Sequence, residues 1–435
     1  MTRQHRILVP GRLGDITTIG QECAPEDAGL SRSEVATLWK SIEAQYRSGL
    51  HPAISVVLRR RGRVVLNRTI GHARGNLPDD AGTLKMRATP ATPICLFSGS
   101  KALTAILVHK LAETGVIQLD HAIAEYLPEF AARGKAGITV RQMLAHRGGI
   151  PQLPVRDPWA GALYDFDAMV RALCAAAPSR PGRGPSYHAL SGGFILGEVL
   201  RRVTGRELPD LLREWLAEPL GCQHLTFGVP QAHRVFAAEN AHTGPIRWTP
   251  VHAVMKRMLQ GTLADACASS NQERWMAAVI PAANIYATAD DACRVYQMLL
   301  DGGVWQGRRL LREETVRELL RPIDRMRFDR TLMLPLRWSS GLMLGSPFPN
   351  FFGLRNPEAY GHLGLVSCLS WADPARDIAA AILTTGKPYL PVGLREQFAT
   401  AMAINAVCAP TERLSLSAVA GNPGELRRSA GETSD

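Results

Sequence analysis

The sequence lacks long apolar runs. No window approaches the roughly 18 uncharged apolar residues that a membrane-spanning helix needs, so no membrane span is expected. The first ten residues carry early positive charge but no apolar stretch of signal-peptide length. The sequence therefore predicts a cytoplasmic protein.

Metal-binding patterns are missing as well. The eight cysteines form no C-x-x-C pair, and the twelve histidines include no H-x-x-x-H pair. This spacing favours buried thiols over a disulfide framework. A G-x-S-x-G elbow is also absent, which argues against an α/β-hydrolase. We expect neither a metal nor an organic cofactor.

Lysine is scarce: it supplies only seven of the 50 basic residues, and arginine supplies the rest. The formal net charge is +11, and a basic protein can bind nucleic acid. The arginines are scattered, however, and no run shows the interleaved basic and aromatic residues of a nucleic-acid surface. We expect a solvated, arginine-biased surface and no nucleic-acid partner.

Apolar residues make up 46% of the 435 residues, which is enough for a large core. Patterns typical of strands stand near both ends of the chain, at 53–70, 337–345, 366–372 and 377–385. Patterns typical of helices lie at 31–47, just after Ser98, through much of 118–220 and at 394–407. This order predicts an α/β (α+β) sandwich, in which helices flank an antiparallel sheet built from both chain ends and a mainly helical region is inserted.

The domain organisation follows from the same patterns. Residues 1–30 are expected to be irregular, 31–408 to form one domain, and 409–435 to be a disordered tail rich in Pro, Ser, Gly, Glu and Arg. Residues 229–280 resemble an insertion with a helical segment at about 249–260. Such an insertion can border a substrate pocket or be a plain surface insertion.

Ser98 and Lys101 form an S-x-x-K motif at the start of a predicted helix. This spacing puts both side chains on one helical face, so the amine can reach the hydroxyl. A serine becomes a nucleophile when a neighbour takes its proton, which a lysine can do only if burial or nearby charge lowers its pKa. An N-cap serine followed by a solvent-reaching lysine would give the same pattern.

Two later segments carry further candidates. Tyr187 stands on a Pro- and Gly-rich loop before a helix. Near a lysine ammonium its pKa is expected to fall, which would make it a general base; a packed loop tyrosine is the alternative. The segment 360–371 predicts a strand edge rich in small residues, where a backbone N–H could complete an oxyanion hole with that of Ser98.

Together these segments resemble the serine β-lactamase and penicillin-binding-protein superfamily, in which S-x-x-K is followed by a tyrosine and then by an element such as His362-Leu363-Gly364. More narrowly, the chain is similar to the esterase branch near class C β-lactamases, the family VIII carboxylesterases, which includes proteins called lipases. Supporting segments lie at 138–149, 196–205 and 281–290. The resemblance covers about 30–408 and implies a β-lactamase-like sandwich.

The resemblance also implies roles for individual residues. Ser98 would be the acyl-accepting nucleophile, and Lys101 and Tyr187 would share the general-acid and general-base work. The backbone N–H groups of Ser98 and Leu365 would stabilise the oxyanion. Four residues would line or support the cleft: His362, Gly364, Asn284 and His146.

Two departures from the superfamily pattern argue against a β-lactam antibiotic as the substrate. Ala189 stands where the β-lactamases of this type usually carry an asparagine, and His362 stands where a K-T-G element carries a lysine. A histidine is mostly neutral near pH 7 and is expected to gain charge below about pH 6.5. Lowering the pH is therefore expected to restore part of the binding of a substrate carboxylate.

The sequence favours a serine carboxylesterase that hydrolyses short-chain esters of small molecules through an acyl-serine. Three alternatives stay open: an acyltransferase on the same scaffold, a residual β-lactamase or D-alanyl peptidase, and a catalytically silent scaffold protein. The oligomeric state is left open too.

Overall fold

The computed structural model describes residues 5–80, 82–244, 250–388 and 390–410. In this part of the chain a ten-stranded sheet runs through the molecule in the order β1-β3-β2-β16-β15-β14-β13-β12-β11, and β4 pairs with β3 beside it. All its pairings are antiparallel. Its strands are β1 (Thr17–Ile19), β2 (Ala53–Arg60), β3 (Arg63–Arg74), β4 (Met86–Arg87), β11 (Arg327–Asp329), β12 (Leu334–Trp338), β13 (Met343–Leu344), β14 (Tyr360–Gly364), β15 (Cys368–Asp373) and β16 (Ile378–Thr384).

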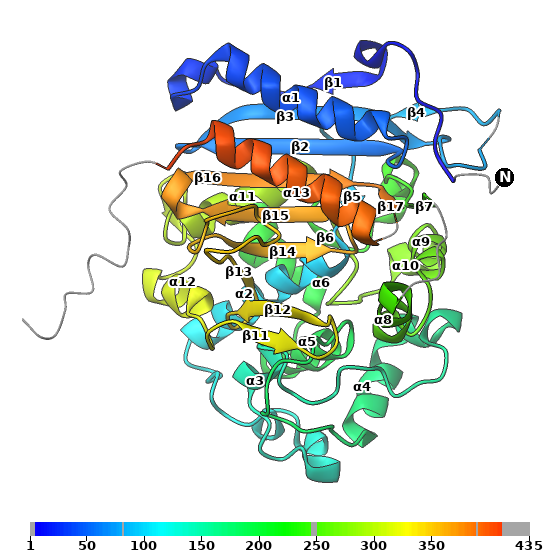
Figure 1. The fold of residues 1–435 in the computed structure, drawn as a ribbon. Helices are drawn as coiled ribbons and strands as arrows, with labels where there is room; N and C mark the ends of the chain where they lie inside the picture. The colour runs from blue at the N-terminus through cyan, green and yellow to red at the C-terminus, as the bar shows by residue number, and fades with distance from the viewer. Residues whose placement is uncertain (1–4, 81, 245–249, 389, 411–435) are drawn as a thin grey trace, which may run out of the picture.

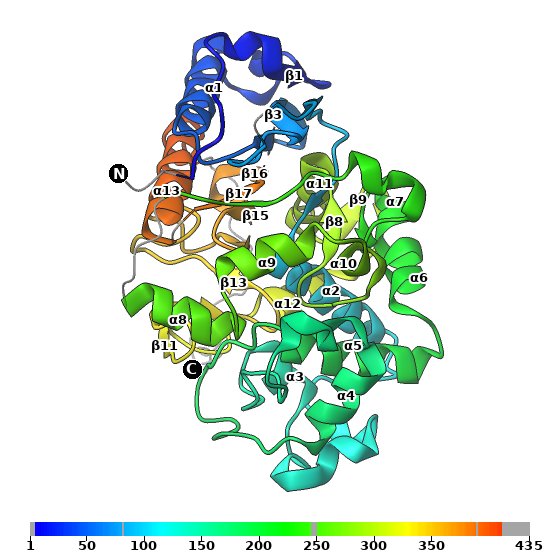
Figure 2. The ribbon, with the colours of Figure 1, turned by 90° about the vertical axis from the view of Figure 1, so that its right-hand side faces the viewer.

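The two ends of the chain meet in the middle of this sheet. β2 pairs with β16 from Ile54 opposite Thr384 to Arg60 opposite Ile378. Every residue of both strands is buried, because helices cover both faces (Figure 2). The helices α1 (Arg32–Arg47) and α13 (Leu390–Val407) lie on one face, and α11 (Ala289–Leu300) lies on the other (Figure 1).

A mainly helical region lies on the same side of the large sheet as α11 (Figure 2). Its helices, with those of the connecting segments, are α2 (Ser100–Glu113), α3 (Val140–Leu144), α4 (Phe166–Ala175), α5 (Ser191–Thr204), α6 (Leu208–Leu212), α7 (Glu218–Leu220), α8 (Pro250–Leu259), α9 (Leu263–Ser270), α10 (Glu273–Ala277) and α12 (Glu313–Leu320). Small sheets pair β5 (Ile94–Cys95), β8 (Ile285–Ala287) and β6 (Thr226–Phe227), then β7 (Ala241–Thr243) with β17 (Gly386–Pro388), and β9 (Val304–Trp305) with β10 (Arg308–Arg309).

The predicted architecture is confirmed: an antiparallel sheet from both chain ends is flanked by helices and carries a helical insertion. The local signals explain the element ends. Ser31 caps α1, since its hydroxyl accepts from the N–H of Glu34 while the Glu34 carboxylate accepts from the N–H of Ser31. Arg61 and Gly62 both have positive φ in the turn of the β2–β3 hairpin.

Two expectations need correction. Residues 1–30 are not wholly irregular where they are described, because β1 pairs with β3 and extends the sheet. The last helix begins at Leu390 rather than at 394, since Pro391 is tolerated in a first helical turn. The predicted tail lies outside the described residues from 411 onward. Within the described ranges, no helix combines the length and apolar character that crossing a bilayer requires.

Candidate active site

Ser98 lies in a tight turn between β5 and α2. The turn is a 3₁₀ segment, Phe97–Gly99, and Phe97 has a φ of 46°. A left-handed φ at a phenylalanine is strained and is kept only when surrounding packing enforces it. The N-cap of α2 is Gly99, and no side chain caps the helix. The structure therefore does not support the interpretation of Ser98 as an ordinary helix cap.

Lys101 lies one helical turn after Ser98 and is buried rather than solvent-reaching. Its Nζ donates to Ser98 Oγ over 2.9 Å and to the carbonyl oxygen of Ala282 over 3.0 Å. Burial holds the pKa of Lys101 well below its usual value, because the charged form loses its hydration. A neutral amine at this distance can take the hydroxyl proton of Ser98.

Tyr187 completes the cluster from the loop before α5. Its ring centre lies 4.9 Å from Lys101 Nζ, and its backbone N–H donates to Asp329 Oδ1 over 3.1 Å. Burial raises the pKa of Tyr187, and a hydrogen bond with the Ser98 side chain lowers it only in part. The expectation of a lowered pKa was wrong, because it assumed a charged ammonium and left out the desolvation of the phenol.

Two neighbouring rings, those of Trp338 and His146, pack against Tyr187. Trp338 stacks on it with 5.8 Å between ring centres, and the His146 ring lies 4.7 Å away. His146 Nδ1 accepts from the backbone N–H of His188 over 3.3 Å, which connects it to the loop that carries Tyr187. Burial holds the pKa of His146 well below its usual value. His146 therefore supports the tyrosine as a neutral ring.

His362 does not act as a pH-dependent cation. Its side chain is 1% exposed, its Nδ1 donates to the carbonyl of Leu363 over 3.0 Å, and burial lowers its pKa to about 3. The expectation that it charges below pH 6.5 was wrong, because that value belongs to a solvated imidazole. Side chains alternate along β14, so Leu363 lines the cavity at Ser98 while His362 packs toward Tyr187 and Trp338.

Gly364 lets β14 approach the turn of the serine. A Cβ at this position would lie 1.9 Å from the carbonyl oxygen of Leu96 and 3.2 Å from the backbone nitrogen of Gly99. The chain then turns sharply through Leu365 (φ 20°) and Val366 (φ 72°). Leu365 and Ser98 line the same cavity.

The resemblance implies that the Leu365 N–H is an oxyanion donor, so Gly364→Ala should lower kcat by about 10²-fold, the usual effect of losing one such donor. The added methyl must push the strand edge away from Leu96 and carry the Leu365 N–H with it. Steady-state kinetics measure the effect, and Gly137→Ala is the control because nothing lies within 4 Å of a Cβ there. A kcat equal to that of the control would show that this edge takes no part in turnover.

Asn284 supports the site without touching the cavity. Its Nδ2 donates to the carbonyls of Trp275 and Ala278 over 3.0 and 2.7 Å, and its Oδ1 accepts from the N–H of Ile280 over 2.8 Å. These bonds fix the loop in which Ala282 offers its carbonyl to Lys101.

Sequence reasoning missed two buried groups that position the site. Asp329 Oδ1 accepts three backbone N–H groups, including that of Tyr187, and no local pattern links residues 142 positions apart. Lys387 lies behind the serine turn, with its Nζ 5.0 Å from the centre of the Phe97 ring. It lies in the short strand β17, three residues after the buried strand β16, and a lone lysine so near a buried strand is the signal that could have found it.

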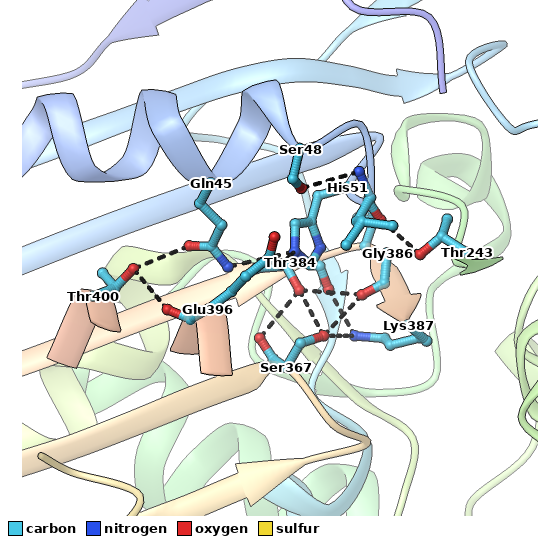
Figure 3. A network of polar contacts seen from close by, with 12 residues as sticks. Gln45, Ser48, His51, Thr243, Ser367, Thr384, Gly386, Lys387, Glu396 and Thr400 are labelled. Carbon is cyan, nitrogen blue, oxygen red and sulfur yellow. Dashed lines mark hydrogen bonds and ion pairs between the residues drawn. The ribbon is translucent and has the colours of Figure 1, made fainter. Parts of the chain in front are cut away.

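Lys387 belongs to the polar network of Figure 3. Its Nζ donates to the carbonyl of Thr384 over 2.6 Å, and Thr384 Oγ1 donates to Ser367 Oγ over 2.7 Å. Ser367 Oγ donates in turn to the carbonyl of Gly386 over 2.8 Å. The network thus anchors the residue that follows the Leu365–Val366 turn.

The cavity in front of Ser98 has a volume of about 450 Å³ and mostly apolar walls. Three helices of the segment 229–280 contribute to these walls: α8 with Met255 and Met258, α9 with Ala266 and α10 with Trp275. Among its lining residues, within the described chain, none carries a charged side chain. The cavity therefore suits an uncharged, apolar substrate.

Comparisons with known proteins agree with this geometry. The chain is 34% identical over 319 residues to the esterase/β-lactamase LipL of Mycobacterium tuberculosis, covering 70% of this chain and 71% of that one. It is 26% identical over 392 residues to a putative D-alanyl-D-alanine carboxypeptidase of Escherichia coli, covering 85% and 86%.

Solved structures give the same result. A family VIII carboxylesterase matches with a TM-score of 0.72 and 28% identity, over 88% of this chain and 100% of that one. A penicillin-binding-protein homologue from Caulobacter crescentus matches with a TM-score of 0.71 and 28% identity, over 87% and 99%. The β-lactamase family model matches residues 39–401. The chain therefore belongs to the β-lactamase family of serine hydrolases.

Proposed function

We propose that this protein is a carboxylic ester hydrolase that works through an acyl-serine at Ser98. The observation that carries the proposal is the buried Lys101 amine, which lies 2.9 Å from the Oγ of Ser98, a residue that lines a cavity without charged side chains among its described lining. The fold is shared with proteins named esterases, which supports ester chemistry.

The proposed reaction has two halves. Neutral Lys101 takes the proton of Ser98 as Oγ attacks the ester carbonyl, and the N–H groups of Ser98 and Leu365 stabilise the oxyanion. Tyr187, a neutral phenol, gives its proton to the leaving alcohol and recovers one from Lys101. Water then attacks the acyl-serine with the same groups in reverse roles, which releases the carboxylic acid. Intact-mass analysis with a fluorophosphonate probe tests the nucleophile, because one adduct should map to the peptide that contains Ser98.

The kcat/KM for a nitrophenyl ester should exceed that for a chromogenic cephalosporin by about 10²-fold. The cavity offers no cation to a substrate carboxylate among its described lining residues, and a charge-assisted contact is worth about 1.5–3 kcal/mol. A nitrophenyl butyrate is the reference ester, because it is an activated ester that carries no carboxylate. Cephalosporin turnover that equals ester turnover would make the protein a β-lactamase instead.

The pH profile separates Lys101 from His362. Burial lowers the pKa of Lys101, so ester turnover should persist below the pH range of an ordinary lysine and fall as the amine protonates at its lowered pKa. Because the pKa of His362 is about 3, cephalosporin binding should not improve between pH 8 and 5.5. Steady-state kinetics with both substrates check this. A rise in cephalosporin turnover near pH 6.5 would contradict the buried, neutral His362.

Acyl transfer to an alcohol uses the same groups. Product analysis with an added alcohol distinguishes it from hydrolysis, since transfer would give a new ester in place of the acid.

A further inference from the structure

A second cavity of about 550 Å³ adjoins the one at Ser98. Five residues line both cavities and form their shared border: Leu334, Met343, Phe351, Pro391 and Leu394. Beyond this border, aromatic and aliphatic side chains such as Leu336, Phe352 and Phe398 continue the apolar surface. The apolar lining of the first cavity therefore continues into that of the second along the first turns of α13.

Gln397 is the unusual residue of the second cavity. Its side chain is 1% exposed and lines this cavity, yet neither its Nε2 nor its Oε1 has a hydrogen-bond partner. Leaving a buried amide unpaired is unfavourable, and almost all buried polar groups have partners. An amide of this kind points to a ligand group that supplies both a donor and an acceptor.

The charged residues of this cavity fit a neutral ligand group better than an anion. Arg337 Nη1 already donates to the carbonyls of Gly345 and Pro357. Arg395 is exposed to solvent, where its attraction for an anion is screened. Gln397 lies deeper than Arg395, and an anion there would pair with its Nε2 but leave its Oε1 without a donor.

We propose that the substrate is an ester whose long apolar acyl chain carries a hydroxyl or carboxamide at its far end, and that this group binds Gln397 in the second cavity. The proposal rests on the ester hydrolase function proposed above. It deepens that function by naming the substrate class, and it replaces the short acyl chain expected from the sequence with a long one, because the second cavity extends the apolar lining.

Paired nitrophenyl esters test the proposal: butyrate, decanoate and ω-hydroxydecanoate. In the native protein, kcat/KM should rise with chain length by about twofold to fourfold per methylene. The ω-hydroxy ester should exceed decanoate by a further threefold to tenfold, roughly the effect of one net hydrogen bond. Gln397→Leu should abolish or reverse that last preference, because leucine binds a methyl end better than a hydroxyl end. Gln231→Leu makes the same exchange at an exposed position outside both cavities, so it should keep the preference.

Two further measurements keep the outcomes distinct. Leu394→Trp narrows the space at the shared border of the cavities and should lower the ratio of decanoate to butyrate kcat/KM by at least about tenfold. Thermal unfolding of Ser98→Ala with each unhydrolysed ester reports binding without turnover, and ω-hydroxydecanoate should raise Tm more than decanoate does. If the native protein turns over butyrate but gives equal kcat/KM for decanoate and ω-hydroxydecanoate, the proposed substrate class is wrong and the proposed hydrolase function still stands. If ω-hydroxydecanoate binds to Ser98→Ala but the native protein does not turn it over, the proposed hydrolase function is wrong instead.

Discussion

Ser98→Ala should lower kcat on a nitrophenyl ester by about 10⁴-fold or more, the effect expected when a covalent nucleophile is removed. Oγ is the atom to which Lys101 Nζ donates, and Ser98 lines the apolar cavity. No other side chain of that lining, within the described residues, offers a hydroxyl at hydrogen-bond distance from the amine. Single-turnover and steady-state kinetics on the same preparation measure the loss.

The folded state should hardly change in this variant. Ser98 caps no helix, since Gly99 is the N-cap of α2, so the loss of about 1 kcal/mol that a missing cap would bring is not expected. Thermal unfolding within a few degrees of the native protein is the control. A folded Ser98→Ala protein that keeps near-native turnover would remove Ser98 from the mechanism.

Lys101→Ala and Tyr187→Phe should each lower kcat by at least about 10²-fold, the usual scale for acid–base groups. The loss of kcat in the double variant should be far smaller than the product of the two single losses, because both groups handle the same proton at Ser98. Lys101→Arg introduces a permanent cation that cannot act as a neutral base, so it should be as inactive as the alanine variant. Independent, multiplicative effects would mean that the two residues do not act as one unit.

Stability against pH gives Lys101 a second signature. Its folded pKa lies below its unfolded value of 10.5, so between the two the unfolded chain binds more protons. The contribution of the neutral amine to the free energy of unfolding is fully present above pH 10.5, and it is lost as the pH falls toward the lowered pKa. Lys101→Met should flatten this part of the curve, which urea unfolding at several pH values measures.

The sequence predicted the parts of the site that depend on local geometry. Ser98 and Lys101 are one helical turn apart, so their contact follows from the period of the helix. The contact of Tyr187 with Asp329 could not be predicted in this way, because it depends on where a loop and a distant strand meet. The Tyr187 and His362 predictions failed for another reason: a pKa is decided by burial, which a spacing pattern does not show.

The fold was predicted more completely than the site. The hairpin at β2 and β3 and the helix α1 carry strong turn and capping signals. The short strand β1 carries none, since three residues bounded by irregular chain have no detectable alternation. The face of β14 that meets the substrate could not be deduced either, because a one-residue change of register exchanges His362 with Leu363.

The meeting of both chain ends in one sheet has a consequence for synthesis. The N–H of Ala53 donates to Thr385 Oγ1, a residue 332 positions later. At about 5–20 residues per second, the ribosome makes β2 roughly 15 to 65 seconds before its partner β16 exists. During that interval the β2–β3 hairpin offers an unpaired, apolar edge to other nascent chains. We expect recovery of active protein to depend on chaperones that shield this edge until translation has passed residue 384.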